Sequence, residues 1–336
     1  METWDLLRNI WFILIGVLFA GYSILDGFDL GLGVLWPFLA RNEDEKRILF
    51  RSIGPVWDGN EVWLLTGGGA LFAAFPHAYA TVFSGFYLAL MLVLFALILR
   101  AVSLEFMSQA GAGKKIWEAA FAVGSFLPAL LFGVALGNVV AGVPLDARME
   151  YTGNFFTLLR PLPLVFGLTG LAAFLLQGSA WAALKTTGEL QARARRAART
   201  MADAVGIGSL LSFAAVWLYL PEALNRVPAW ICGALVWLAL GLLVSSLDRG
   251  RDGRAFLFSS MAFLALWGTV GALHYPNLVR ATDPALSLTI ANASSSALTL
   301  KVMLAIALAG MPLVVAFTIY AYRVFRGKTG TAGPGY

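Results

Sequence analysis

The chain has 336 residues, of which 59% are hydrophobic and only 13% are charged, with a mean hydropathy of +0.77 and a formal net charge of +5. This composition lies far outside the range of soluble domains and predicts an integral membrane protein. The single cysteine, Cys232, excludes an internal disulfide and any thiolate metal cluster built by this chain alone.

Apolar runs follow one another along almost the whole chain. A hydrocarbon core is spanned by roughly 20 mainly apolar residues, so the sequence predicts an all-α protein of about nine transmembrane helices. The first run is too long and too acidic for a cleavable signal peptide, and we expect it to remain as the first helix. The expected spans are approximately residues 8–37, 49–75, 79–104, 116–142, 161–184, 203–221, 228–247, 255–275 and 299–323.

The basic residues are unevenly divided between the two sets of helix ends. Eighteen of the 24 lysines and arginines, including Arg100 at the end of the third span, belong to one set. Because cytoplasmic connections carry the excess of Lys and Arg, the N-terminus is expected outside and the C-terminus in the cytoplasm. Basic clusters that alternate with apolar runs are typical of topology signals, so we expect no nucleic-acid partner. The Arg-rich stretch "ELQARARRAART" is either such an anchor or a site for anionic lipid headgroups.

Two of the expected spans contain pairs of carboxylates. Asp26 and Asp29 lie in "GYSILDGFDLGLG", and Asp58 and Glu61 lie in "WDGNEVW". Residues three apart share a helix face. At 1.5 Å per residue from the basic ends, we expect depths of about 10 Å for Asp58, 15 Å for Glu61, 18 Å for Asp29 and 22 Å for Asp26. If the two helices pack together, the acids form a staggered ladder. The small residues expected to permit this packing are Gly27, Gly31, Gly33 and Gly59.

Three interpretations of these acids stay open at this point. They satisfy helix breaks or pair with an arginine of a partner, they form a proton or cation conduit, or they bind a divalent metal. Helical spacing alone does not decide among the three.

Only two histidines are present, His77 and His274, and both fall near the expected outer helix ends. They are either a pair of haem ligands or polar groups at the membrane interface. The second interpretation is favoured by their terminal positions beside Pro and Tyr, so we expect the chain to hold no haem of its own. No Gly-rich phosphate loop follows an expected strand, which disfavours nucleotide chemistry.

Five stretches carry a resemblance to a known family. "GYSILDGFDLGLG", "GPVWDGNEVWL", "GGGALFAAFP", "YTGNFF" and "NASSSALTL" occur in order and resemble the signature stretches of subunit II of the cytochrome bd family of quinol oxidases. The resemblance implies one transmembrane domain over residues 1–336, with two four-helix units at about 1–145 and 155–276 and a final helix at about 299–323.

The resemblance also implies the setting of the chain. It would lie in the bacterial cytoplasmic membrane as a heterodimer with subunit I, which would hold haem b and haem d, or b-type haems, and the quinol-oxidising loop. A small accessory subunit, lipid and quinol complete the implied partners. The resemblance thus makes the chain part of an electrogenic, oxygen-reducing enzyme whose redox centres lie in its partner.

Several site residues follow from the same motifs. Asp29 and Asp58 match acids of a proton path toward the haem, and Asp26 and Glu61 are candidates on the same faces. Trp63 matches a position near a lateral opening for oxygen, and Trp57 with Arg100 suggests a bound quinone. Val56 stands where some branches carry a histidine, so a relay through that histidine is excluded here. The alternative function is a secondary transporter whose intramembrane acids bind a coupling ion.

Overall fold

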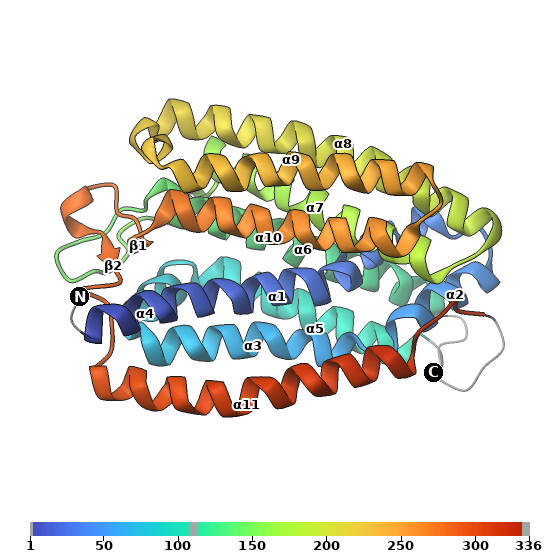
Figure 1. Cartoon of the computed structure of the whole chain (residues 1–336), viewed down its shortest axis with the longest axis horizontal. Helices are drawn as coiled ribbons and strands as arrows, with labels where there is room; N and C mark the ends of the chain where they lie inside the picture. Colours follow the sequence, from blue (N-terminus) through green and yellow to red (C-terminus); the bar gives the residue numbers. More distant parts are fainter. Residues whose placement is uncertain (1–2, 108–112, 331–336) are drawn as a thin grey trace.

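The computed structural model describes residues 3–107 and 113–330 and shows a bundle of long helices, as expected for an all-α membrane protein (Figure 1). The helices are α1 (Thr3–Leu39), α2 (Glu43–Ile53), α3 (Trp57–Ala74), α4 (Pro76–Gly85), α5 (Tyr87–Phe106), α6 (Lys114–Ala141), α7 (Pro161–Lys185), α8 (Gly188–Tyr219), α9 (Val227–Asp248), α10 (Asp252–His274) and α11 (Ala297–Val324). Three short 3₁₀ turns and two short strands lie in the connections: η1 (Phe155–Leu158), η2 (Pro221–Asn225), η3 (Pro284–Leu286), β1 (Asn277–Val279) and β2 (Leu288–Thr289).

Eight of these helices are long and apolar enough to cross a membrane, namely α1, α5, α6, α7, α8, α9, α10 and α11. Helix α3 adds 18 residues that run beside α1 (Figure 1), but the acids and Asn60 near its start lower its hydropathy. The expectation of one unbroken span over 49–75 was wrong. Pro55 has no backbone N–H and interrupts the helical hydrogen bonds, so the chain forms α2, a short break and then α3.

Two other expected boundaries also differ from the structure. The span expected over 79–104 is divided at Phe86 into α4 and α5. Helix α8 begins at Gly188, well before the expected position 203, and therefore includes the Arg-rich stretch as helix. Hydropathy detects only the apolar part of a helix, so it cannot show a polar helical extension beyond the hydrocarbon.

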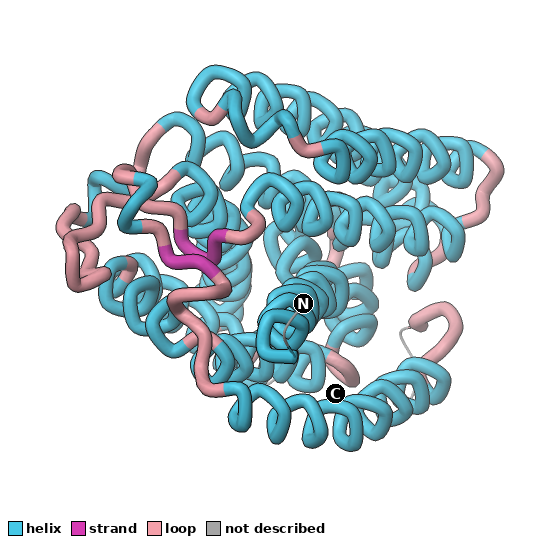
Figure 2. The backbone as a smooth tube through the Cα atoms, turned by 60° about the vertical axis from the view of Figure 1, so that its left-hand side comes forward, coloured by secondary structure: helices cyan, strands magenta, loops and turns pink. Residues whose placement is uncertain are grey.

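Helix α1 lies near the centre of the bundle and packs against α3, α6 and α7. Helix α7 in turn contacts α6, α8 and α10, and α9 packs along α10. Figure 2 shows α11 lying along the outside of the bundle, where it contacts α1 and α3. In Figure 1, α3 and α5 lie below α1, and α8, α9 and α10 lie above it.

Glycines set the closest helix approaches, but not between the helices expected from sequence. Gly31 and Gly178 face each other where α1 crosses α7, and a methyl group on Gly31 would overlap the Phe174 carbonyl. Gly27 and Gly33 face α7 and α6, whereas Gly59 has open space beside it. The packing of α1 against α3 depends instead on Gly21, which lies under the Trp63 ring, and on Gly67, which lies under Phe19.

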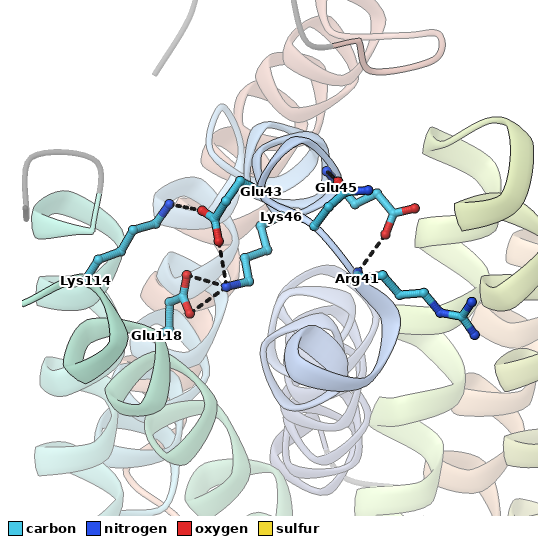
Figure 3. A network of polar contacts seen from close by, with 7 residues as sticks. Arg41, Glu43, Glu45, Lys46, Lys114 and Glu118 are labelled. Atoms are coloured by element: carbon cyan, nitrogen blue, oxygen red, sulfur yellow. Dashed lines mark hydrogen bonds and ion pairs between the residues drawn. The ribbon is translucent and has the colours of Figure 1, made fainter.

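Helix α2 lies across the basic end of the bundle and is fixed to α6 by ion pairs (Figure 3). Lys46 Nζ lies 2.8 Å from Glu118 and 3.0 Å from Glu43, and Lys114 also binds Glu43. Hydrogen bonds from Lys114 and Lys46 hold the pKa of Glu43 below its usual value. Asn42 caps the start of α2 by accepting from the backbone N–H of Glu45.

At the opposite end, two connections distant in sequence form one small layer. Strands β1 and β2 pair antiparallel, and a parallel bridge joins Val143 to Ala281. The backbone N–H of Val143 donates to Arg280 O at 2.9 Å, and the N–H of Thr282 donates to Val143 O at 2.9 Å. These bonds tie the α6–α7 connection to the α10–α11 connection.

Candidate functional site

A fully buried arginine lies between α1, α3 and α5. Arg100 is six residues before the end of α5. Both terminal nitrogens of its guanidinium donate hydrogen bonds to the Asp26 carboxylate. Nη2 lies 2.6 Å from Asp26 Oδ1, and Nη1 lies 3.1 Å from Oδ2. Such bidentate arginine–carboxylate pairs are among the strongest charge-assisted hydrogen bonds in proteins.

Two further acids meet the same guanidinium. Glu61 Oε1 lies 2.9 Å from Arg100 Nη1, and Asp29 Oδ2 lies 4.0 Å from Nη2. Asn60 donates a hydrogen bond of 2.8 Å to that same Asp29 oxygen. We call Asp26, Asp29, Asn60, Glu61 and Arg100 the charge cluster.

The charge cluster is buried except at Glu61. The side chains of Asp26, Asp29 and Arg100 are 0% exposed, whereas the Glu61 side chain is 25% exposed. Tyr322 of α11 donates a hydrogen bond of 2.9 Å to Asn60 Oδ1. Among the described residues, Asp29 Oδ1 and Arg100 Nε lie buried without any hydrogen-bond partner. The cluster therefore keeps an open carboxylate oxygen deep in the protein.

The local sequence explains why these groups converge. The three-residue spacing places Asp26 and Asp29 on one face of α1, as predicted, and both turn toward Arg100. The break at Pro55 starts α3 at Trp57, which brings Asn60 and Glu61 beside that face in the first two turns. The acids were expected at separate depths, yet three of them meet at one cation.

The sequence analysis named Arg100 as a candidate residue but expected it at a helix end. It was grouped with the basic residues of the inner helix ends, whereas the structure encloses it completely. Its signal in the sequence is a single cation following the apolar run "LALMLVLFALIL", because an ionised group inside such a run is costly unless it is paired. Tyr322 was missed entirely, since nothing in the sequence of the last helix relates it to Asn60.

The remaining candidates lie outside this network. Asp58 is exposed in the first turn of α3, one turn before Glu61, and Trp57 is half-buried at the start of that helix. Trp63 packs its ring onto Gly21 of α1. The bonds described above thus join Asp26, Asp29, Glu61 and Arg100 but do not include Asp58, Trp57 or Trp63.

The geometry bears on metal and haem binding. In the described ranges, no group of three or more His, Cys, Asp and Glu side chains is placed to hold a metal ion. The guanidinium of Arg100 also occupies the space between the carboxylates, and its charge would repel a cation. His274 Nε2 is bonded to Leu278 O at 2.8 Å, and His77 is exposed at the start of α4. Nε2 of His274 is therefore already hydrogen-bonded to the protein backbone.

Together these features define a polytopic, all-α membrane protein with a charge cluster buried between three helices. Residues 7–325 match the family described as cytochrome bd terminal oxidase subunit II, and the chain belongs to that family.

Relatives and a solved structure agree with this assignment. The chain is 36% identical over 369 aligned positions to "Cytochrome bd-I ubiquinol oxidase subunit 2" of Escherichia coli (strain K12), covering 98% of this chain and 96% of that protein. It is 35% identical to "Cytochrome bd ubiquinol oxidase subunit 2" of Bacillus subtilis (strain 168), with 98% of both chains covered. Its fold is similar to a chain in the structure of bd oxidase from Geobacillus thermodenitrificans, with a TM-score of 0.79 at 18% identity, covering 95% and 98% of the two chains.

Proposed function

We propose that this chain, as subunit II of a quinol oxidase, conducts protons through its charge cluster toward the oxygen-reducing haem of subunit I. The observation that carries the proposal is that three carboxyl groups share one buried guanidinium while only one of them is partly exposed. Because the chain belongs to the oxidase family, we interpret these acids as part of an oxidase and not of a secondary transporter.

The charge balance explains how the cluster would hold a proton. One guanidinium cannot balance three ionised carboxylates away from water, so an excess proton lowers the electrostatic energy of the cluster. Asp29 Oδ1 is free to carry that proton, because its other oxygen accepts the hydrogen bond from Asn60. Both oxygens of Asp26, in contrast, accept hydrogen bonds from Arg100.

The exposed acids suggest the direction of the route. Asp58 lies on the outer surface of α3, and Glu61 follows one helical turn later with a partly exposed side chain. A proton would therefore enter at the basic end by Asp58 and be exchanged through Glu61 with the buried Asp29 and Asp26. We place subunit I against the exposed side of Glu61, so that the same carboxyl group would pass the proton on toward the haem.

The other functional assignments are proposals of the same kind. Haem b and haem d, or b-type haems, would be held by subunit I and would supply electron transfer to oxygen. Trp63 would border an oxygen opening, and Trp57 with Arg100 would lie near a quinone. We further propose a bacterial cytoplasmic membrane location, one transmembrane domain built of two four-helix units and a final helix, and a small accessory subunit.

The test of the proton route is a pair of isosteric changes in the assembled oxidase. Asp58→Asn and Glu61→Gln keep shape and hydrogen bonding but cannot exchange a proton near neutral pH. We expect steady-state oxygen consumption to fall by about tenfold, equivalent to roughly 1.4 kcal/mol on the limiting step. The reduced haem spectrum should remain unchanged.

Asp44→Asn on the exposed side of α2 is the matched control and should leave turnover intact. Normal oxygen consumption and proton uptake by assembled Asp58→Asn and Glu61→Gln complexes would contradict the route. Failure of both variants to assemble would instead indicate a structural role.

Orientation is tested separately. In a Cys232→Ser background, a cysteine at Asp44 should react with a membrane-impermeant reagent only from the cytoplasmic side. A cysteine at Asp283 in the α10–α11 connection should react only from outside. The reverse labelling pattern would overturn the proposed orientation and the direction of the proton route.

A further inference from the structure

A cavity of about 640 Å³ lies at the basic end of the bundle. It is bordered by the α2–α3 connection, the ends of α7 and α11, the first turns of α10 and the chain that follows α11. The backbone after α11 is fastened over it, because the N–H of Thr329 donates to Lys185 O at 2.7 Å. The cavity is thus part of the ordered structure of this end.

The cavity is lined by cations. Arg51, Lys185, Arg326 and Lys328 all contribute to its wall, and none of its described lining residues is acidic. Lys328 Nζ lies 3.9 Å from a carboxylate oxygen of Asp252, which does not line the cavity. That carboxylate is already held by Arg195 with two contacts of 2.7 Å.

Lys185 is the most enclosed of these cations. It is only 7% exposed, its Nζ donates to Phe325 O at 2.5 Å, and it lies 4.9 Å from the centre of the Trp181 ring. Within the described residues it forms no ion pair with a carboxylate. Trp181 also lines the cavity, and its buried indole N–H has no hydrogen-bond partner there. A buried cation without a counter-ion and an unused donor both favour an anion.

Helix ends alone do not account for so much positive charge. Helices α2, α7 and α11 end at the cavity, whereas α3 and α10 begin there. With roughly half a charge at each terminus, the five helix ends sum to about −0.5, which is smaller in size than the summed charge of Lys185, Arg326 and Lys328. Even if Asp252 is included, positive charge remains in excess.

We propose that this cavity binds a phosphate-bearing anion, with its phosphate held by Lys185, Arg326 and Lys328. Phosphate oxygens accept several charge-assisted hydrogen bonds at once, which suits a site rich in donors and empty of acceptors. The same chemistry is offered by a phospholipid headgroup and by free phosphate. The apolar side chains of Leu184, Phe256 and Val324 would accommodate the first carbons of a lipid's acyl chains.

The experiment compares binding to the purified, delipidated oxidase complex by native mass spectrometry. The probes are a short-chain phosphatidylglycerol, the matching phosphatidylcholine and inorganic phosphate. The variant is Arg326→Gln with Lys328→Gln, since both side chains lie in the exposed segment after α11. The matched control is Arg249→Gln with Arg254→Gln, two exposed cations at the same end that do not line the cavity.

We expect the wild type and the control to bind one more molecule of the anionic phosphate probe than the variant does. The affinity of the variant for this probe should be lower by about tenfold or more. Saturable phosphatidylglycerol binding without competition from phosphate assigns the site to a lipid headgroup. Binding of phosphate alone, or competition by it, assigns the site to a free anion. Lys185→Arg should retain binding because it keeps the buried charge.

Equal binding by wild type and variant would overturn the proposal, as would tighter binding of phosphatidylcholine than of phosphatidylglycerol. Loss of subunit I from a folded variant would also overturn it, because the cations would then recognise an acidic protein segment.

Discussion

The two sides of the bundle handle charge in opposite ways. Around α8, α9 and α10, ion pairs occur at the basic end, where Asp252 binds Arg195 and Asp248 binds Arg199. Between α1, α3 and α5, the charges lie in the interior. A charge cluster in the interior therefore distinguishes the helices α1, α3 and α5 from α8, α9 and α10.

The two regions also differ in how completely their acids are satisfied. Asp252 receives bonds on both oxygens, from Arg195 on Oδ1 and from Arg195 and Gln191 on Oδ2. Asp29 keeps one oxygen without a partner in the described part of the chain. Full satisfaction is what a structural carboxylate needs, whereas an open oxygen leaves room for a proton.

The largest expected effect follows from removing the cation of the charge cluster. Arg100→Met leaves buried carboxylates without their counter-ion, so we expect a loss of about 3–5 kcal/mol and poor assembly of the complex. The measurement is the yield and thermal unfolding of the complex beside Arg195→Met at the basic end, which should lose far less. Equal stability of the two variants would remove the difference between the two regions.

The next effect tests the boundary between the two sides. Gly178→Val places side-chain atoms against the backbone of Leu32 and Gly31, where α7 crosses α1. Overpacking of this kind costs typically 1–3 kcal/mol, which should lower the unfolding temperature of the complex. Gly241→Val on α9 is the control, because nothing lies near that glycine. A similar melting temperature for both variants would show that the crossing adapts.

A smaller effect separates a proton carrier from a structural acid. Asp29→Asn should slow oxygen consumption by about tenfold while the haem spectrum is retained. Asp252→Asn should leave turnover unchanged and affect only stability, because its partners hold helices together at the basic end. Oxygen consumption and the melting curve are measured for both. A slower Asp252→Asn enzyme with a normal Asp29→Asn enzyme would reverse the roles argued above.

The smallest effect concerns the contact of α2 with α6. Lys46→Met removes the ion pair with Glu118, and amides of α2 should exchange with solvent about two- to fivefold faster, as expected for a partly exposed pair. The pKa of Glu43 is lowered from its ordinary value of 4.5 by its lysine partners. The ionised Glu43 therefore stabilises the folded state fully above pH 4.5, and this stabilisation is lost as the pH falls through the lower pKa of the folded state. The protection of wild-type α2 amides, taken relative to the intrinsic exchange rate at each pH, should therefore fall in that acidic window. Identical exchange in both proteins at neutral pH would contradict this role.

Much of the fold was predictable because hydrophobic length identifies a membrane helix directly. The break between α2 and α3 was missed although Pro55 marks it in the sequence, because the expected spans were set by hydropathy, and hydropathy also does not show the polar extension of α8. Helical spacing correctly placed Asp26 and Asp29 on one face. Their meeting with Arg100 was beyond the sequence, because it depends on which of several apolar helix faces come together.

The Tyr322–Asn60–Asp29 series has a directional consequence. Tyr322 donates its hydroxyl hydrogen to the amide oxygen of Asn60, and the amide nitrogen donates to Asp29 Oδ2. An amide does not readily pass on a proton it receives, because its own N–H hydrogens do not leave at neutral pH. In the proposed route, Asn60 would therefore block proton transfer from α11 to the acids, and a proton would reach Asp29 from the Glu61 side.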